Sequence, residues 1–577
     1  MDRIDAADKR SHLYPALPPD ATRLRVVALV GHVNAPTWIA ETLAAIVDSD
    51  VADLVTIGAV TAPAPRHLPR LLELFLHADA WIGGVARMAT ARCSLPGRLP
   101  QTIFIGCRAR QTEPTLELAD EDLQRLAEAK PDLIVSIGLP PAGPRLAAAA
   151  RLGVWTFERY AFDPLRSALW LLDPVMRGDP VTRGGLLVHL SELGDWRVLQ
   201  PLRSATSQLS FSRNRANQLL RTPALLVRAL RELALGRSPA LHPAPQFQPP
   251  GTLAMCVFGL RFVLRGLRRQ LPRLGRVESW FLAVRRGRRL DPAAPRLDEF
   301  QRVDAPPGHF WADPCALRHD GRDYVFVEDY PYATRRGLIT AIELGGDLRP
   351  ARTWVALETA WHLSYPCLFE WNGDIYMTVE SSETQRVTLY RARRFPDQWE
   401  QVSHLLHGWN IVDPTLHFDG TRWYLFATVK ESALSYDDRI WDDLFLFSAP
   451  TPLGPWRPHP NNPIVSDVRA ARPAGRLFVH EGRLIRPSQD CSVEYGYAVV
   501  FNEVTELDPE RYAERPIGRL EPSWDAHLKG CHTYSTSADL EVLDAKILIG
   551  QGREHARANA TSTARPVSNE PMSEETS

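Results

Sequence analysis

Short runs of consecutive apolar residues, many of them β-branched, recur in the first half of the chain. The runs LRVVALV at 24–30, VADLVTIGAV at 51–60 and PDLIVSIGL at 131–139 are continuous rather than alternating. Buried strands of a parallel sheet have this pattern, because both of their faces are covered. Helical stretches lie between them, such as LADEDLQRL at 118–126, which has an acidic first turn and apolar positions at helical spacing. The alternation predicts an α/β domain over residues 23–235.

A linker and a basic amphipathic stretch follow, over residues 236–279. The segment GRSPALHPAPQFQPPG at 236–251 is rich in proline and has no periodicity, which marks a linker. Beyond it, leucines and phenylalanine alternate with the arginines Arg261, Arg265, Arg268, Arg269, Arg273 and Arg276. Two interpretations stay open: contact with an anionic membrane surface, or a connecting helix whose arginines are solvated.

Residues 280–551 carry a repeated strand, turn and strand. The repeat prolines Pro314, Pro366, Pro414 and Pro473 lie 52, 48 and 59 residues apart, and a fifth unit begins near His532. A unit of this size cannot bury both of its faces alone, which is typical of propeller blades. The pattern predicts a C-terminal all-β domain, a five-bladed propeller, in a multidomain protein.

The composition of the chain limits the classes of partner that we expect and indicates a cellular location. The 67 basic and 68 acidic residues give a net charge of -1, so no overall field favours nucleic acid. Seven cysteines without CxxC pairs argue against a disulfide framework and a zinc site, and we expect no metal. The start carries no secretory pattern and no apolar run is long enough to span a bilayer, so we expect a cytoplasmic protein or one peripheral to the inner membrane. The polar ends, 1–22 and 552–577, are predicted to be disordered.

The repeat also predicts a functional site. In a propeller the first strand of each blade lines the central channel, so the residues before the repeat prolines should converge there. They are Asp313, Tyr365, Asp413 and Arg472, joined by His532 of the last unit. A second register, seven residues after the turn glycines, contributes Glu328, Glu380, Ala427 and Gln489. Unpaired buried charges are costly, so this set indicates a polar site rather than a purely structural ring.

Several long blocks of this half resemble a known family. FWADP, HLSYPCLFEWNGDIYMTVESS, VDPTLHFDG, SDVRAARPAGRLF and RPSQDCSVEYGYAVVFNEVTEL resemble the domain at the N-terminus of plant glucosamine inositolphosphorylceramide transferases and its bacterial homologues. More distantly, the region is similar to five-bladed glycoside hydrolases of family 43. That similarity implies Asp313 as general base and Asp413 as the aspartate that tunes a pKa. The partners implied are a sugar nucleotide, a lipid-linked sugar or a glycan.

The position of the hydrolases' general acid differs in this chain. Those enzymes have a glutamic acid where this sequence has Arg472, and a guanidinium stays protonated and cannot serve as that acid. Hydrolysis by two carboxyl groups would then need Glu328 or Glu380. An arginine suits a phosphate or a carboxylate, so we predict that Arg472 and His532 hold an anionic group. The full predicted substrate-binding set is Tyr365, Arg472, Gln489, Asp490 and His532.

The first half resembles formyltransferases that use formyl-tetrahydrofolate, which implies a Rossmann-type domain. The resemblance rests on PDLIVSIGL, RLGVWTF and LWLLDPVMRGDPVTRGGLLVHLSELGDWRVL, in that order. That family carries Asn, one residue and then His after the second of these strands, and an Asp in a later turn. The matching positions here are Thr156, Glu158 and Asp195, so only the aspartate is kept. Formyl-tetrahydrofolate is expected as a cofactor only if this degenerate domain is active.

Three classes of function stay open. The first is glycosyl transfer in bacterial surface polysaccharide or glycolipid biosynthesis, with the site in the propeller channel. The second is sugar N-formyl transfer from formyl-tetrahydrofolate. The third is hydrolysis of the family 43 type, or a glycan-binding scaffold without catalysis. The missing export pattern favours biosynthesis over secreted glycan degradation.

Overall fold

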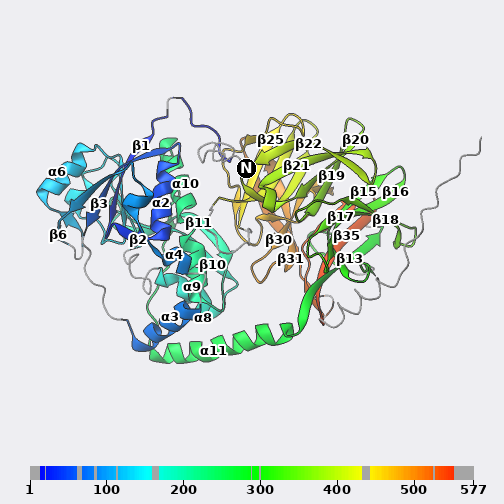
Figure 1. The fold of residues 1–577 in the computed structure, drawn as a ribbon, viewed down its shortest axis with the longest axis horizontal. Coiled ribbons are helices and arrows are strands. Elements are labelled where there is room, and N and C mark those ends of the chain that lie inside the picture. The colour runs from blue at the N-terminus through cyan, green and yellow to red at the C-terminus, as the bar shows by residue number, and fades with distance from the viewer. Residues whose placement is uncertain are drawn as a thin grey trace, which may run out of the picture.

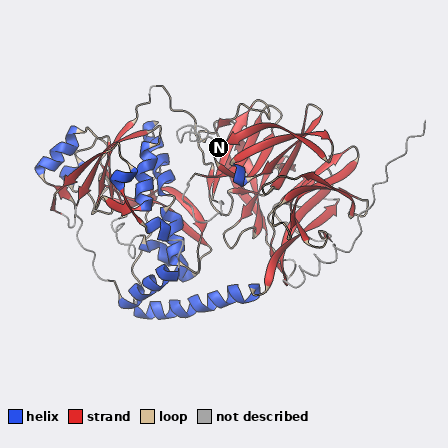
Figure 2. Cartoon of the chain, viewed as in Figure 1, coloured by secondary structure: helices blue, strands red, loops and turns tan. Residues whose placement is uncertain are grey.

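The computed structural model describes residues 13–550, except 20, 61–67, 83–86, 112–114, 159–167, 288, 298–299, 432–441, 524 and 526. Helices and a mixed sheet form the N-terminal region, and strands fill the C-terminal region (Figure 1, Figure 2). The predicted tail at 552–577 and residues 1–12 of the predicted disordered start lie outside the described residues. Leu13 and Tyr14, from the same predicted start, are buried.

An eight-stranded sheet forms the centre of the N-terminal region, in the order β12-β11-β10-β9-β8-β1-β3-β5. Its strands β5, β3, β1, β8 and β9 are mutually parallel, and β10, β11 and β12 extend it antiparallel. The bounds are β1 Leu24–Val30, β3 Ala52–Val60, β5 Ile103–Cys107, β8 Leu133–Ile137, β9 Val154–Phe157, β10 Val181–Leu190, β11 Asp195–Ala205 and β12 His242–Pro243.

Helices cover both faces of this sheet, which explains the continuous apolar strands. In β1, Val26 and Val30 face one core, and Val27 and Leu29 face the other. The first core includes α2 (Thr37–Val47), α3 (Arg70–Ile82), α4 (Arg87–Thr90), α5 (Leu95–Arg98), α8 (Leu172–Arg177), α9 (Phe211–Leu219) and α10 (Thr222–Ala234). The second includes α6 (Asp120–Glu128) and α7 (Pro144–Ala147). Two small ribbons pair β2 (Asn34–Pro36) with β4 (Arg92–Ser94) and β6 (Ala109–Gln111) with β7 (Glu117–Leu118). The predicted α/β class is confirmed, whereas the formyltransferase-like fold stays a prediction.

Five small antiparallel sheets make up the C-terminal region, and the predicted five-bladed propeller is confirmed. The first two blades are β15 (His309–His319), β16 (Arg322–Pro331), β17 (Leu338–Leu344), β18 (Pro350–Leu357), and β19 (Ser364–Trp371), β20 (Asp374–Glu380), β21 (Arg386–Arg394), β22 (Gln398–His407). The third has β23 (Asn410–Phe418), β24 (Trp423–Lys430), β25 (Asp443–Ala449), β26 (Arg457–Pro458) and β27 (Val465–Ser466). The fourth has β28 (Arg472–Pro473), β29 (Phe478–His480), β30 (Arg483–Asp490), β31 (Ala498–Leu507) and β32 (Tyr512–Leu520).

The fifth blade closes the ring with strands from both ends of the propeller sequence. It contains β13 (Arg276–Arg286), β14 (Gln301–Val303), β33 (Leu528–Gly530), β34 (Tyr534–Ser537) and β35 (Leu540–Gly550). β13 pairs with β35 along its whole length, from Arg276 opposite Gly550 to Arg286 opposite Leu540. The strand therefore begins at Arg276, four residues before residue 280, where the sequence placed the domain boundary.

The repeat prolines mark a β-bulge in each of the first three blades. Asp313, Tyr365 and Asp413, the residues before them, have φ values of 51°, 48° and 51°. The strand register shifts at the same place in each blade. Proline has no N–H for the ladder, and a residue at positive φ bends the strand and turns its side chain out of the usual alternation. One local motif thus places three of the predicted site residues in equivalent positions.

The hairpin turns after these strands contain the predicted turn glycines in equivalent positions, with one exception. Asp320–Gly321, Asn372–Gly373 and Glu481–Gly482 have positive φ at both residues, as tight hairpin turns require. The third hairpin is longer, because Phe418 pairs with Trp423 across residues 419–422. Thr428, opposite Val412, is therefore the equivalent of Glu328 and Glu380, and the predicted assignment of Ala427 was wrong by one residue.

A buried ionic network joins the two regions. The Arg228 guanidinium of α10 pairs with Glu431 and, at 3.1 Å, with Asp443 of the third blade. Tyr14 accepts a hydrogen bond from Arg228 and donates one to Glu431. Beside it, Arg221 pairs with Asp442. Because a guanidinium buried between two domains is stable only with its carboxylates in place, the network fixes the N-terminal region against the propeller.

The helix α11 (Thr252–Gln270) makes the covalent connection. It runs along one edge of the molecule from the neighbourhood of α3 and α8 to β13 (Figure 1). Among the helices of the described residues, none has the length and apolar character needed to cross a bilayer.

Candidate functional site

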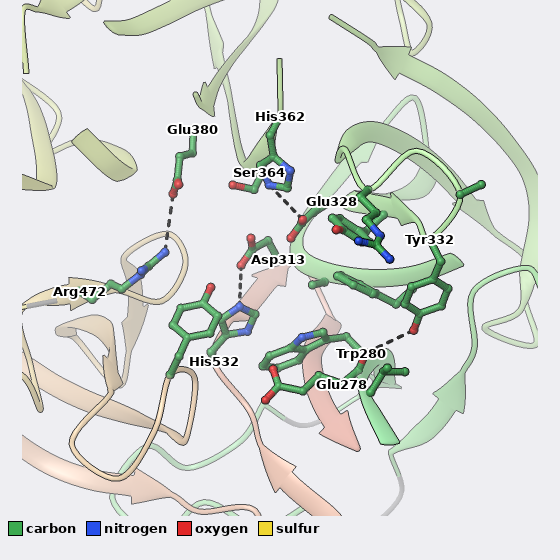
Figure 3. A pocket seen from close by; sticks show the side chains of 17 residues that line it. Glu278, Trp280, Asp313, Glu328, Tyr332, His362, Ser364, Glu380, Arg472 and His532 are labelled. Atoms are coloured by element: carbon green, nitrogen blue, oxygen red, sulfur yellow. Dashed lines mark hydrogen bonds and ion pairs between the residues drawn. The ribbon is translucent and has the colours of Figure 1, made fainter. Parts of the chain in front are cut away.

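A pocket of about 700 Å³ lies where four of the five blades meet. Five of the predicted residues line it: Asp313, Glu328, Glu380, Arg472 and His532 (Figure 3). They come from β15, β16, β20 and β28 and from the segment before β34. The structure therefore brings together carboxyl groups, a guanidinium and an imidazole that are up to 219 residues apart in sequence.

Asp313 is held by a chain of three side chains. His532 lies between two carboxylates, with Nε2 3.3 Å from Asp313 Oδ1 and Nδ1 2.7 Å from Asp544 Oδ2. The Thr533 hydroxyl donates to Asp313 Oδ1 at 2.9 Å, and the Asp313 amide donates to Asp544. Asp544 was absent from the predicted set, and it orients the histidine from behind.

Burial brings the pKa of Asp313 close to neutrality. Burial raises the pKa of Asp313 to about 7, although the neighbouring His532 opposes this rise. Burial acts to lower the pKa of His532, but Asp544 and Asp313 outweigh it, so that pKa is raised. A carboxylate with a pKa near the working pH suits a general base.

The donor atoms of Asp313, His532 and Asp544 lie within 4.8 Å of one another, as in a metal site. Both imidazole nitrogens already face a carboxylate. One histidine cannot direct both nitrogens at a single ion. The three side chains therefore form an array in which an imidazole lies between two carboxylates.

Glu380 lines the pocket and shares the Arg472 guanidinium with Asp413, which is buried and does not line the pocket. Arg472 pairs through Nε with Asp413, and its Nη2 lies 3.2 Å from Asp413 Oδ1 and 3.7 Å from Glu380 Oε2. Glu380 Oε2 also accepts the Asp413 amide at 3.1 Å. Burial raises the pKa of Glu380 well above its usual range, and the nearby Asp413 raises it further. The surroundings of Glu380 thus favour its protonated form.

This pairing changes the interpretation of Arg472. The sequence placed it as a holder of an anionic group, but its charge is engaged by Asp413. Gln489 donates a second hydrogen bond to Asp413 at 3.0 Å, so that the carboxylate is fully held in place. The arrangement favours a role in neutralising and positioning carboxyl groups over direct phosphate binding.

Glu328 is positioned by a histidine that the sequence did not single out. His362 Nδ1 accepts the Gly337 amide at 2.9 Å, and its Nε2 lies 3.3 Å from Glu328 Oε1. His362 also lines the pocket. His362 lies two residues before the repeat motif SYP at 364–366. A closer alignment of the blades around this motif could have found it.

Aromatic rings form the remaining wall. Trp280 stacks on His532 with ring centroids 4.1 Å apart, and Phe310 stacks on Tyr330 at 4.7 Å. Tyr332 completes this wall. Flat apolar surfaces beside a few polar groups are usual in sites for small organic ligands such as sugars. No sequence pattern pointed to this wall, because Trp280 precedes the first repeat and the other rings lie at the ends of strands.

Three predicted substrate-binding residues support the site without lining the pocket. Tyr365 lies deeper, with its hydroxyl bonded to Thr415 at 2.9 Å and to the Gly475 amide at 2.6 Å. Gln489 holds Asp413, as described above. Asp490 pairs with Arg519 at 3.0 Å and is 1% exposed. All three are buried within the blades, where their polar groups are satisfied by protein partners.

The degenerate formyltransferase positions do not share a pocket among the described residues. Thr156 is fully buried in β9, and Asp195 lies at the exposed start of β11, 3.3 Å from Arg197. Glu158 follows β9, accepts the Ala168 amide at 2.8 Å, and has its pKa raised by burial. The space beside it measures about 20 Å³. Residues 159–167, which follow Glu158, lie outside the described residues.

A second pocket, of about 680 Å³, lies between the two regions. Its walls come from the segment before α9, from the end of α11 and from the fourth blade. Hydroxyl groups of Thr206, Ser207 and Ser210 line it together with five basic and three acidic side chains of the described residues. Glu278 and Tyr495 belong to both pockets, so the two pockets adjoin.

Comparison with known proteins identifies relatives of the propeller. Residues 299–548 match the family described as glucosamine inositolphosphorylceramide transferase 1, N-terminal. The chain is 34% identical over 223 residues to glucosamine inositolphosphorylceramide transferase 1 of Oryza sativa subsp. japonica, a match covering 37% of this chain and 28% of that protein. The protein of the same name from Arabidopsis thaliana is 35% identical over 221 residues, covering 36% and 27%. The chain thus spans little more than a quarter of the length of these relatives.

Solved structures with a similar region are carbohydrate-active proteins of low sequence identity. The GH43 β-xylosidase/α-arabinofuranosidase CoXyl43 from a compost microbial metagenome is 13% identical, with a TM-score of 0.32, over 46% of this chain and 94% of that one. The inulosucrase from Halalkalicoccus jeotgali is 18% identical, with a TM-score of 0.30, over 37% and 72%. At these identities the likeness concerns the fold alone. Over residues 299–548, this chain is therefore similar to the N-terminal family of glucosamine inositolphosphorylceramide transferase 1.

Proposed function

We propose that the propeller pocket binds a sugar and catalyses glycosyl transfer to an acceptor hydroxyl, in the assembly of a bacterial surface polysaccharide or glycolipid. One observation carries the proposal: a single pocket holds a carboxyl group with a pKa of about 7 and a second one whose surroundings favour the protonated form. Asp313 is the first and Glu380 is the second. A pair of carboxyl groups with separated pKa values provides a general base and a general acid.

In the proposed reaction, Asp313 takes the proton of the acceptor hydroxyl while the oxygen of that hydroxyl forms a bond to the anomeric carbon of the donor sugar. The bond from that carbon to the leaving oxygen breaks, and Glu380 gives its proton to the leaving group. His532, held by Asp544, orients Asp313. When the donor is a sugar nucleotide, the leaving phosphate needs no proton, and Glu380 then serves through hydrogen bonding.

Neighbouring side chains support the reaction by positioning the carboxyl groups of the pocket. Arg472 and Gln489 hold the Asp413 side chain in place beside Glu380, and Asp413 contributes to the raised pKa of Glu380. Glu328 lies on the wall next to the aromatic rings, where a carboxylate suits the hydroxyl groups of a bound sugar.

For the acceptor, we propose a lipid with a phosphorylated headgroup. The relatives are named for inositolphosphorylceramide, which contains such a headgroup. The second pocket adjoins the first, and its lining has an excess of basic over acidic side chains and several hydroxyl groups. Phosphate oxygens are readily held by this combination. A cytoplasmic protein working at the inner membrane would meet both a soluble donor and a lipid acceptor.

Two other functions compete for the same pocket. With water in place of the acceptor, the same two carboxyl groups would hydrolyse a glycoside, and with neither reaction the pocket would simply bind glycan. Formyl transfer by the N-terminal region has less support, because Thr156 and Glu158 stand where the resembling family carries its Asn and His.

The proposal is tested by offering the purified chain a panel of sugar nucleotides and lipid-linked sugars, with phosphorylated lipids as acceptors, and following products by mass spectrometry. We expect a glycosylated acceptor from the wild type and from the control Asp347→Asn, which changes an exposed turn carboxylate. Asp313→Asn and Glu380→Gln should lower product formation by about 100-fold or more.

The other outcomes separate the competing functions. Release of free sugar without an acceptor would indicate hydrolysis. Sugar binding without any reaction, unchanged in both variants, would indicate a scaffold. Release of tetrahydrofolate from formyl-tetrahydrofolate and an amino-sugar nucleotide would establish formyl transfer.

A further inference from the structure

The helix α11 exposes a continuous apolar stripe. Leu253, Val257, Leu260, Leu264 and Leu267 are spaced alternately by four and three residues, which places them on one side of a helix. Their exposed fractions are 80%, 45%, 64%, 44% and 49%. Leu271 and Leu274 continue the same spacing beyond the helix, at 59% and 70%. Large apolar side chains scattered singly are normal on a surface, but a stripe of this length marks an interaction site.

The opposite side of α11 is fixed to the protein. Met255 and Phe258 belong to the core of the N-terminal region, and Phe258 meets the ring of Phe75 at 5.0 Å. Further along, the Arg265 guanidinium donates to the carbonyl of Val175 at 2.7 Å. The helix is therefore held by one side, and the stripe faces outward because of this packing.

The segment formed by α11 and the residues just after it carries only positive charges. Residues 252–276 contain six arginines and no aspartate or glutamate. Arg261 and Arg268 are exposed, and the helical spacing places them along one border of the stripe. Arginines bordering an apolar face are typical of helices that lie in the plane of an anionic membrane, with the apolar side chains among the acyl chains.

The end of α3 extends the apolar surface next to α11. Leu74, Trp81 and Ile82 are 66%, 77% and 72% exposed. Phe75 of α3 contacts Phe258 and Phe262 of α11, so the two helices lie side by side at the same edge of the molecule (Figure 1). Tryptophan is favoured at the boundary between lipid headgroups and acyl chains.

We propose that α11 and the end of α3 form a docking surface for an anionic lipid bilayer, and that the protein lies on the membrane without crossing it. A second copy of the chain is a poorer occupant, because it would bring two sets of arginines together. A neutral apolar partner would leave the arginines without a complement. An anionic bilayer satisfies the apolar stripe and the positive border at once.

Docking in this orientation would place the second pocket at the membrane surface. Ile82 at the end of α3, Arg269 and Gln270 at the end of α11, and Arg273 just beyond α11 line that pocket. A lipid headgroup would then reach the pocket directly from the bilayer. The docking inference itself does not depend on glycosyl transfer, since a vesicle without any acceptor lipid tests it.

The chain carries a natural reporter for this surface. All seven cysteines lie among the described residues, and Cys256 on α11 is the exposed one. A polarity-sensitive fluorophore on Cys256 of the full chain is to be followed during titration with vesicles of phosphatidylcholine alone and of phosphatidylcholine with phosphatidylglycerol. We expect a blue shift and co-sedimentation with the phosphatidylglycerol vesicles, both weakened by added salt.

Two sets of variants separate the apolar and the charged contributions. Arg261→Gln with Arg268→Gln should weaken binding to phosphatidylglycerol vesicles by about 25-fold, which corresponds to about 1 kcal/mol for each arginine. Leu260→Glu with Leu264→Glu should abolish binding and the blue shift. The matched control is Val355→Glu with Val479→Glu, which changes two equally exposed apolar residues of the propeller, at 54% and 56%.

Equal binding by the leucine variants and the control would overturn the proposal, as would the absence of a blue shift with anionic vesicles. A dimer in solution that Leu260→Glu with Leu264→Glu dissociates would instead identify the stripe as a contact between copies. Unchanged thermal unfolding of each variant, measured by circular dichroism, would show that lost binding does not reflect lost folding.

Discussion

Replacing Asp313 by asparagine should raise the stability of the folded protein and abolish its glycosyl transfer activity. The carboxyl group is 4% exposed, and burial raises its pKa from 3.8 to about 7. Above the folded-state pKa, the native protein must therefore keep an ion that the fold disfavours. Asparagine has nearly the same shape and can accept the Thr533 hydroxyl in the same way, but it carries no charge at any pH.

The sign and size of the effect follow from proton linkage. Between pH 3.8 and about 7 the folded state binds the proton of Asp313 more tightly than the unfolded state does, so stability falls as the pH rises through this range. At about 1.4 kcal/mol for each pH unit, the full difference is about 4 kcal/mol above pH 7. Because ionised Asp313 also attracts a proton to His532, part of this cost is offset, and we expect Asp313→Asn to gain about 2 to 4 kcal/mol at pH 8.

The assay is thermal unfolding of both proteins from about pH 5 to about pH 8, with glycosyl transfer measured on the same samples. The variant should show a rising advantage in melting temperature as the pH increases, together with loss of transfer. Wild-type transfer should itself fall as the pH drops below about 7, because the base becomes protonated. A variant that is less stable than the wild type at pH 8, or an advantage that does not change with pH, would refute the reasoning.

Three further substitutions test the fold and the aromatic wall. Arg228→Ala removes the buried partner of Asp443 and should destabilise the contact between the two regions by about 3 to 5 kcal/mol, seen as earlier unfolding in calorimetry. Gly475→Ala should cost at least about 3 kcal/mol in urea unfolding, because Gly475 has a φ of 119° and an added Cβ would overlap the Tyr534 carbonyl. Tyr330→Ala should weaken sugar binding by roughly fivefold in titration calorimetry, through loss of a stacking surface.

Each of these has a control of the same residue type. Arg177→Ala breaks an exposed helical ion pair and should change stability by less than about 0.5 kcal/mol. Gly346→Ala meets open space and should be nearly neutral. Phe418→Ala removes an exposed ring of the third blade outside the pocket and should leave sugar binding intact. Equal effects of test and control would show that the structural reasons given are wrong.

The strands could be predicted from the sequence, because the pattern that specifies them lies within a few neighbouring residues. Continuous apolar runs predicted the parallel strands, since the sheet is covered on both faces. The repeat prolines predicted the blades, since the first three blades share one bulge followed by a hairpin. Where a hairpin changed length, at residues 419–422, the same reasoning placed Ala427 where Thr428 belongs.

The site was predictable only as far as the repeat extends. Asp313, Glu328, Glu380, Arg472 and His532 were placed in one channel from their positions alone, and they do line one pocket. Their partners were not predictable. Asp544 lies 231 residues from Asp313 along the chain, and Trp280 precedes the repeat altogether.

By itself, the sequence determined the order of α/β region and propeller, the number of blades and five of the residues that line the pocket. These features depend on periodicity and on the backbone preferences of proline and glycine. Only the tertiary structure decided that Arg472 pairs with Asp413, that His532 links two carboxylates and that a second pocket adjoins the first. It also decided that the stripe of α11 faces outward. The physical reason is that charge pairing, burial and exposure depend on which distant segments meet, and a local pattern carries no record of that meeting.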